Sequence, residues 1–151
     1  MQRACLIFAI VLATTVAGIN PGAAELVLAI GFAVGGPTHG WVYGQSSGGD
    51  AATVALNICR GIDTTNNVIP ANPSEAQKNC AIVATLNNHC FAISSNGTQA
   101  KSPTGFSWVV APDSKAANGQ AIANCEKMKA KGDASCTIRG ARCDSSAAHP
   151  E

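Results

Sequence analysis

The chain has 151 residues, a length suited to one domain, and its 10 basic residues against 9 acidic ones leave it almost uncharged. This balance argues against a nucleic-acid partner, whose binding depends on neutralising phosphates, and against docking of a polybasic segment on a membrane. Aromatic residues make up only 5% of the chain, so small side chains must build most of the core. Cross-links would compensate for the modest apolar area that such a core buries.

The N-terminal segment has the pattern of a secretory signal peptide. Arg3 provides a positive charge, residues 4–17 are almost wholly apolar, and small residues precede Glu25, where we expect cleavage. The apolar run is shorter than the ~20 residues that a membrane-spanning helix needs. We therefore expect residues 1–24 to be a signal peptide and residues 25–151 to form a single domain. No membrane span would remain after processing, and the protein would be secreted or periplasmic.

After this segment, strand-like and helix-like patterns follow one another in an order that occurs twice. The expected strands are residues 26–34, 39–44, 80–86, 90–95, 105–110 and 136–141. The expected helices are residues 51–59 and a second one from Asp113 or Ser114 to about Lys131. We predict an α+β fold made of two β-β-α-β repeats, at about 26–86 and 90–143. Neither repeat could bury its own sheet face, so we expect one shared antiparallel sheet with both helices packed on it.

Six cysteines follow the signal segment, and an even count in an exported chain indicates disulfides. They fall into two sets of three that end similar stretches of chain: Cys59, Cys80 and Cys90, then Cys125, Cys136 and Cys143.

The repeat narrows the fifteen pairings that six cysteines allow. One cysteine of each set ends the helix and the next begins the following strand, which predicts the local pairs Cys59–Cys80 and Cys125–Cys136. Cys90 and Cys143 would form the third pair, which could join the two repeats. A metal site is the alternative, but Cys-x-x-Cys does not occur and the histidines have no recognisable ligand spacing. We expect no metal and no cofactor.

The order of motifs resembles a known family. An Ala-Ile-Gly strand, a Gly-Trp-x-Tyr strand, an Ala-rich helix ending in Cys and a strand that begins with Cys, all repeated once, are similar to the bacterial "domain of unknown function 4189" family of small exported proteins. The resemblance covers about residues 28–143 and implies the fold and export, without an activity. It also implies that the link Ile62–Asn79, which contains Pro70 and Pro73, is much longer than usual. We expect this polar link to be exposed and mobile, or to form a binding loop particular to this chain.

The two tryptophans, Trp41 and Trp108, fall at equivalent positions of the repeats when the cysteines are aligned. As core residues they would supply much of the buried aromatic area, whereas as exposed residues they would form a binding face. We favour the core, and keep Trp41, Tyr43 and Trp108 as the candidate binding surface.

Candidate catalytic groups are sparse. His39 and His89 could act as general bases, but no paired carboxylates accompany them, and we assign no catalytic residue. The glycine-rich stretch 46–50 precedes a helix but lacks the lysine of a phosphate loop, so we interpret it as a turn and helix cap. Asn96-Gly97-Thr98 matches a glycosylation sequon, which we expect to be unoccupied because the family resemblance is bacterial.

These patterns favour an exported, non-enzymatic binding module, such as an inhibitor, an immunity protein or a host-facing factor. Its partner would be another protein or an envelope component, since a rigid cross-linked surface loses little entropy on binding. A secreted hydrolase that uses His39 or His89 and a structural component of the envelope are the alternatives.

Overall fold

The computed structural model describes residues 25–63, 65–66, 68–97 and 103–144. The expected signal peptide, residues 1–24, lies outside this part. In chain order the elements are β1 (Leu26–Phe32), η1 (Pro37–His39), β2 (Trp41–Ser47), α1 (Ala51–Cys59), α2 (Glu75–Lys78), β3 (Ala81–Leu86), β4 (Cys90–Ser95), β5 (Phe106–Ala111), α3 (Ser114–Met128) and β6 (Thr137–Cys143). The α+β class and the two β-β-α-β repeats are confirmed.

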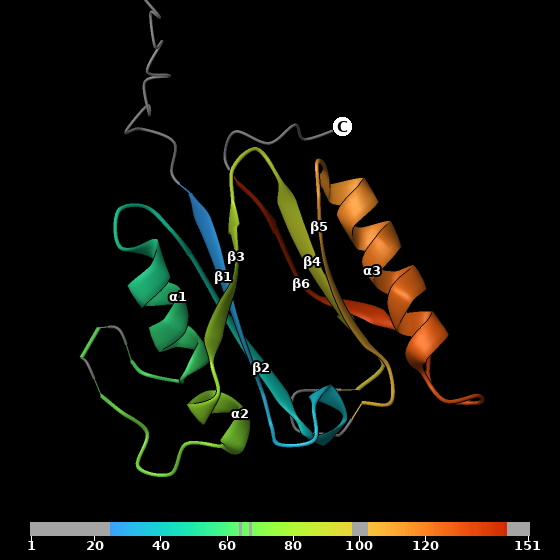
Figure 1. Cartoon of the computed structure of the whole chain (residues 1–151), viewed down its shortest axis with the longest axis horizontal. Helices are drawn as coiled ribbons and strands as arrows, with labels where there is room; N and C mark the ends of the chain where they lie inside the picture. The colour runs from blue at the N-terminus through green and yellow to red at the C-terminus, as the bar shows by residue number, and fades with distance from the viewer. Residues whose placement is uncertain (1–24, 64, 67, 98–102, 145–151) are drawn as a thin grey trace, which may run out of the picture.

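The six strands form two antiparallel sheets, with the orders β2-β1-β3 and β5-β4-β6. The expectation of one shared sheet was wrong, and the central strands show why. In β1, Leu26, Leu28 and Ile30 alternate with Val27 and Ala29, and all five side chains are buried. A strand that is apolar on both faces must be covered on both sides. Each sheet therefore packs one face on its own helix and the other face on the second sheet, with α1 and α3 on the outside (Figure 1).

The large side chains lie between the two sheets. This central cluster consists of Leu26, Leu28, Ile30, Trp41, Leu86, Phe91, Ile93 and Phe106. The outer layers contain small residues instead, as where Ala51 and Ala55 of α1 pack on Val27 and Ala29. Small residues let the helix approach the sheet closely, and a Cβ atom on Gly44 would collide with the carbonyl oxygen of Ala55.

The structure contains the three disulfides that the repeat predicted. Cys59–Cys80 joins the end of α1 to the residue before β3, and Cys125–Cys136 joins α3 to the residue before β6. Each local disulfide therefore fixes a helix to the sheet that it covers, as expected.

The third disulfide, Cys90–Cys143, has the predicted partners but a different role. Its cysteines are register partners on the neighbouring strands β4 and β6. The suggestion that this disulfide could join the two repeats was wrong, because both strands belong to the sheet of the second repeat.

Candidate functional site

The aromatic residues of β2 and β5 do not form a common binding surface. Trp41 is 1% exposed and its ring lies 5.0 Å from that of Phe106, so the preference for the core is confirmed at this position. Tyr43 and Trp108 are half-buried and pack against the same central cluster.

The two tryptophans also have different environments, contrary to the cysteine alignment. Trp41 and Phe106 are each the first residue of their strand and are buried, whereas Tyr43 and Trp108 are each the third and are half-buried. The repeated pattern is therefore Gly-aromatic-x-aromatic, beginning at Gly40 and at Gly105. Trp41 cannot contribute to a binding surface.

His39 lines a pocket of about 250 Å³ where η1 and β2 meet α2. Ser74 and Glu75 line the same pocket, so a histidine, a hydroxyl and a carboxylate come together. The Ser74 hydroxyl, however, accepts a hydrogen bond from the backbone N–H of Gln77 and caps α2. The His39 ring is hydrogen-bonded to the Thr38 hydroxyl at 3.1 Å. Within the described residues no hydrogen bond joins His39 to Ser74, so the pocket does not form a nucleophile–base pair.

His89 lies in the turn between β3 and β4, and its Nδ1 is 2.7 Å from the carbonyl oxygen of Asn87. The turn is held by buried Asp144, whose carboxylate accepts a hydrogen bond from the backbone N–H of Asn88 at 2.9 Å. The η1 turn that ends at His39 and the β3–β4 turn that contains His89 lie at opposite ends of the molecule in Figure 1. They therefore do not form one site.

The chain also contains one serine motif that was not predicted to be functional. The run Gly44-Gln45-Ser46-Ser47-Gly48 fits the Gly-x-Ser-x-Gly pattern of hydrolases, in which the serine sits on a sharp turn between a strand and a helix. Here Ser46 lies inside β2 and pairs with Val27, so the structural context of that motif is absent.

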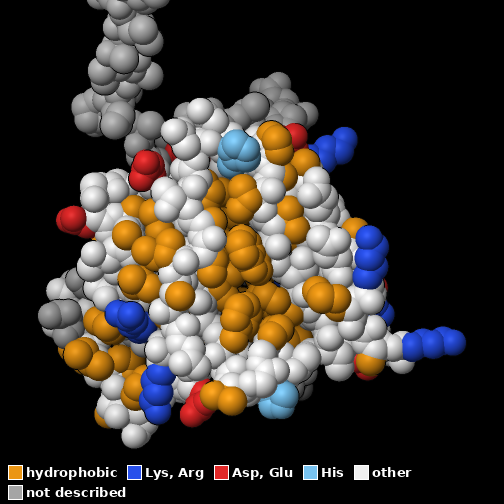
Figure 2. Space-filling view, viewed as in Figure 1, with side chains coloured by type: hydrophobic (Ala, Val, Ile, Leu, Met, Phe, Trp, Pro, Cys, Tyr) orange, Lys and Arg blue, Asp and Glu red, His pale blue; other side chains and the backbone are white. Residues whose placement is uncertain are grey.

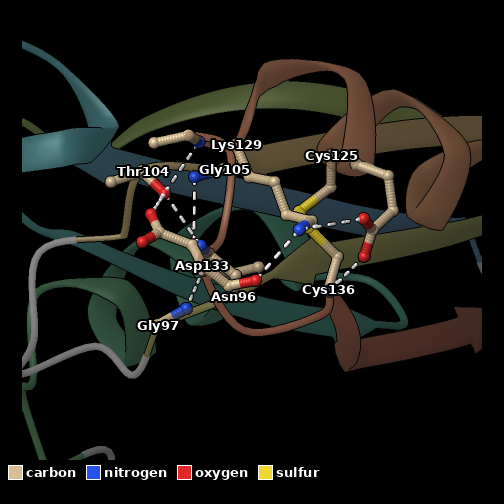
Figure 3. Close-up of a disulfide and its surroundings, with 11 residues drawn as sticks. Asn96, Gly97, Thr104, Gly105, Cys125, Lys129, Asp133 and Cys136 are labelled. Carbon is tan, nitrogen blue, oxygen red and sulfur yellow. Dashed lines mark hydrogen bonds and ion pairs between the residues drawn. A yellow bond between two sulfur atoms is a disulfide. The ribbon is translucent and has the colours of Figure 1, made fainter.

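Beside the Cys125–Cys136 disulfide, a polar network connects the end of β4 to the residues just before β5 (Figure 3). The side chain of Asn96 accepts a hydrogen bond from the backbone N–H of Gly105 and donates one to the hydroxyl of Thr104, which in turn donates to Asp133. The Asn96 amide of the sequon is thus already used within the protein. We interpret this network as structural.

The described residues of the long link between α1 and β3 have a defined structure. Its ends are joined by Cys59–Cys80, and the short helix α2 within it is capped reciprocally by Ser74 and Gln77. Near its start, the Asp63 carboxylate accepts hydrogen bonds from Thr65 and Asn66. The helix α2 was not predicted from the sequence, although Ser-x-x-Gln at 74–77 is a recognised capping-box signal.

The link carries the most exposed neighbouring pair of large apolar side chains in the described chain: Val68 is 58% exposed and Ile69 is 70% exposed. Beside them is a pocket of about 130 Å³, which is lined by Arg60, Ile62, Ile69, Pro70, Pro73, Gln77 and Lys78. We call these seven residues and Val68 the link surface. The view in Figure 2 shows apolar and basic side chains close together at the lower left of the molecule.

The link surface is positively charged at its rim. Arg60 and Lys78 are exposed, and neither makes an ion pair within the part of the chain that the structure describes. No carboxylate lines the pocket. The Asp63 carboxyl has a pKa below its usual range. The main cause is the hydrogen bond from the Asn66 side chain, and backbone hydrogen bonds from Thr65 and Asn66 add to it.

Residues 28–143 match the domain of unknown function DUF4189. The chain belongs to this family. No curated protein and no solved structure matches this DUF4189 chain.

Among its described residues, no cluster of three or more His, Cys, Asp or Glu side chains could hold a metal ion. The same residues include no helix that is long and apolar enough to cross a membrane.

Proposed function

We propose that this DUF4189 chain is an exported, non-enzymatic binding protein and that the link surface is where its partner binds. The observation that carries the proposal is the exposure of Val68 and Ile69 next to an apolar pocket. Side chains of this kind, gathered together and rimmed by polar groups, are typical of interaction sites.

The rigidity of the link surface supports the proposal. The disulfide Cys59–Cys80 joins the two sides of the link, and the capping box fixes α2 within it. A surface fixed before binding loses less conformational entropy when a partner docks.

Export is supported by the disulfides, because such cross-links persist in oxidising compartments and are rare in the cytosol. The mass of the exported protein tests this part of the proposal. We expect a chain that lacks residues 1–24, and a mass that includes Met1 to Ala24 would contradict the assigned signal peptide.

The binding proposal is tested by affinity capture on immobilised mature protein, with culture medium and envelope extract from the native source. The variant Val68→Ser/Ile69→Ser should lose the captured partner. Val34→Ser/Val110→Ser is the matched control, because it makes the same kind of change at exposed residues outside the link. Equal capture by both variants would contradict the proposal.

A hydrolase is the second candidate, since His39, Ser74 and Glu75 line one pocket. The capping role of the Ser74 hydroxyl weighs against it, because a serine nucleophile needs a base within hydrogen-bond reach.

A further inference from the structure

We propose that the link surface receives a segment of another protein that presents one branched or aromatic side chain flanked by acidic residues. This inference rests on the proposed function of the link surface, and adds the chemistry of the partner. It follows from the size of the pocket, its charge and its rigidity.

The size of the pocket restricts what can enter. Its volume is about 130 Å³, whereas sites for small molecules and cofactors are typically ~300–1,000 Å³. An apolar cavity of about 150 Å³ holds a molecule as small as benzene. The pocket therefore suits one apolar side chain, which is how a protein segment anchors itself at the centre of an interface.

The lining of the pocket favours a branched or aromatic group. Ile62, Ile69, Pro70 and Pro73 provide apolar walls, while the polar lining residues are Arg60, Gln77 and Lys78. The oxygen of the Gln77 amide is already engaged, because it accepts a hydrogen bond from the backbone N–H of Ser74 at 2.7 Å. The polar groups left to meet a ligand are therefore the two cations and the amide N–H groups of Gln77, all of them donors.

The positive charge at the rim of the pocket indicates which residues flank the apolar side chain of the partner. Two carboxylates are close in sequence to these cations. Glu75 lines the His39 pocket and not this one. The Asp63 carboxylate accepts hydrogen bonds from Thr65 and Asn66. Arg60 and Lys78 therefore have no carboxylate partner in the described part of the chain. Two unneutralised cations beside one apolar pocket complement carboxylates placed next to an apolar side chain.

The rigidity of the pocket makes binding of a short segment feasible. Proline fixes its own φ, and Pro70 and Pro73 both lie in the wall. Gly61 turns the chain from α1 toward the pocket with φ of 71°, and a side chain there would collide with Gln77. The pocket thus needs little reorganisation when a segment docks.

The test uses three blocked pentapeptides and the ¹⁵N-labelled mature protein with its disulfides intact. The probe is acetyl-Gly-Asp-Leu-Glu-Gly-amide. One control peptide replaces both acidic residues by Lys, and the other replaces Leu by Ser. We expect amide shifts at millimolar peptide to concentrate on the non-proline residues of 60–62 and 69–78 with the probe, and to be absent with both controls.

Two protein variants test the cations separately. Arg60→Gln/Lys78→Gln should weaken binding of the probe about fivefold, which is the order expected for two exposed charge pairs. The matched control Lys115→Gln/Lys127→Gln removes two exposed cations of α3 and should leave binding unchanged. Equal binding of the three peptides, shifts away from the pocket, or no shifts with any peptide would each overturn the inference.

These results are distinguishable from failure of the proposed function. If capture depends on Val68 and Ile69 while the acidic peptide does not bind, the link surface is a binding site for a partner of other chemistry. If capture is indifferent to Val68 and Ile69, the proposed function itself fails.

Discussion

The ring of Tyr43 on β2 lies directly against Gly140 on β6, so the two sheets are in close contact at this edge. A Cβ atom at position 140 would lie 2.6 Å from the hydroxyl oxygen of Tyr43 and 2.7 Å from Cζ. The hydroxyl donates a hydrogen bond to the carbonyl oxygen of Arg139 at 3.4 Å, and the ring stacks on Trp41 with centroids 6.0 Å apart. This contact helps to set how one repeat packs on the other.

Gly140→Ala should lower the free energy of unfolding by about 1–3 kcal/mol, because the added methyl group overlaps the Tyr43 ring. Denaturant unfolding measures the effect. Gly119→Ala is the control, since this exposed glycine of α3 has no atom within 4 Å of its added Cβ, and it should gain about 0.5–1 kcal/mol. In a Tyr43→Leu background the cost of Gly140→Ala should shrink. An unchanged cost there would show that the overlap with Tyr43 is not its cause.

Removal of the disulfides should destabilise the protein in the order of the loops that they close. Their sequence separations are 53 for Cys90–Cys143, 21 for Cys59–Cys80 and 11 for Cys125–Cys136. The chain-entropy relation gives about 4 kcal/mol for the first and about 3 kcal/mol for each of the others. Paired Cys→Ser variants compared by denaturant unfolding measure the order. The smallest loss for Cys90–Cys143 would contradict the entropic account.

Acid should loosen the turn at the start of the link. The pKa of Asp63 is lowered below 3.8 by hydrogen bonds from Asn66 and Thr65. Because the carboxyl has a lower pKa in the folded chain, its hydrogen bonds stabilise the turn at pH values above the unfolded pKa. This contribution disappears as the pH falls through the folded pKa. An NMR titration of the Asp63 carboxyl should have its midpoint below 3.8, and the Thr65 amide should shift with the same midpoint. In Asp63→Asn the amide shift should vanish. A midpoint at or above 3.8 would disagree with this geometry.

Replacement of either candidate general base should leave partner binding intact. His39 and His89 occupy separate places, and neither lies in the link surface. His39→Ala and His89→Ala are compared with the unmodified protein by capture and by assays for hydrolysis of envelope polymers, with circular dichroism as the control for folding. Turnover that disappears in folded His39→Ala would favour the hydrolase instead.

The sequence predicted the repeats and the cysteine pairs because both depend on local order along the chain. Cys59 and Cys80 are adjacent in the fold because one ends α1 and the other immediately precedes β3. The division into two sheets depends on which strands become neighbours. The unbroken apolar run from Leu26 to Ile30 was a signal for a strand covered on both faces.

The candidate binding surface was predicted less well. The link was recognised as unusual, but its composition did not reveal the pocket, because the pocket combines Arg60 after α1 with Lys78 at the end of α2. The predicted equivalence of Trp41 and Trp108 was wrong. Their matching intervals to the cysteines suggested equivalence, whereas strand position places Trp41 with Phe106.

Site-specific photo-crosslinking in the producing cell shows whether the link surface binds a partner. A photoreactive benzoylphenylalanine would replace Ile69 in the link surface, and, in a separate protein, the exposed Val110 of β5. We expect a discrete crosslinked partner from position 69, lost when Val68 is also changed to Ser, and none from position 110. A partner crosslinked from position 110, with none from position 69, would contradict this expectation.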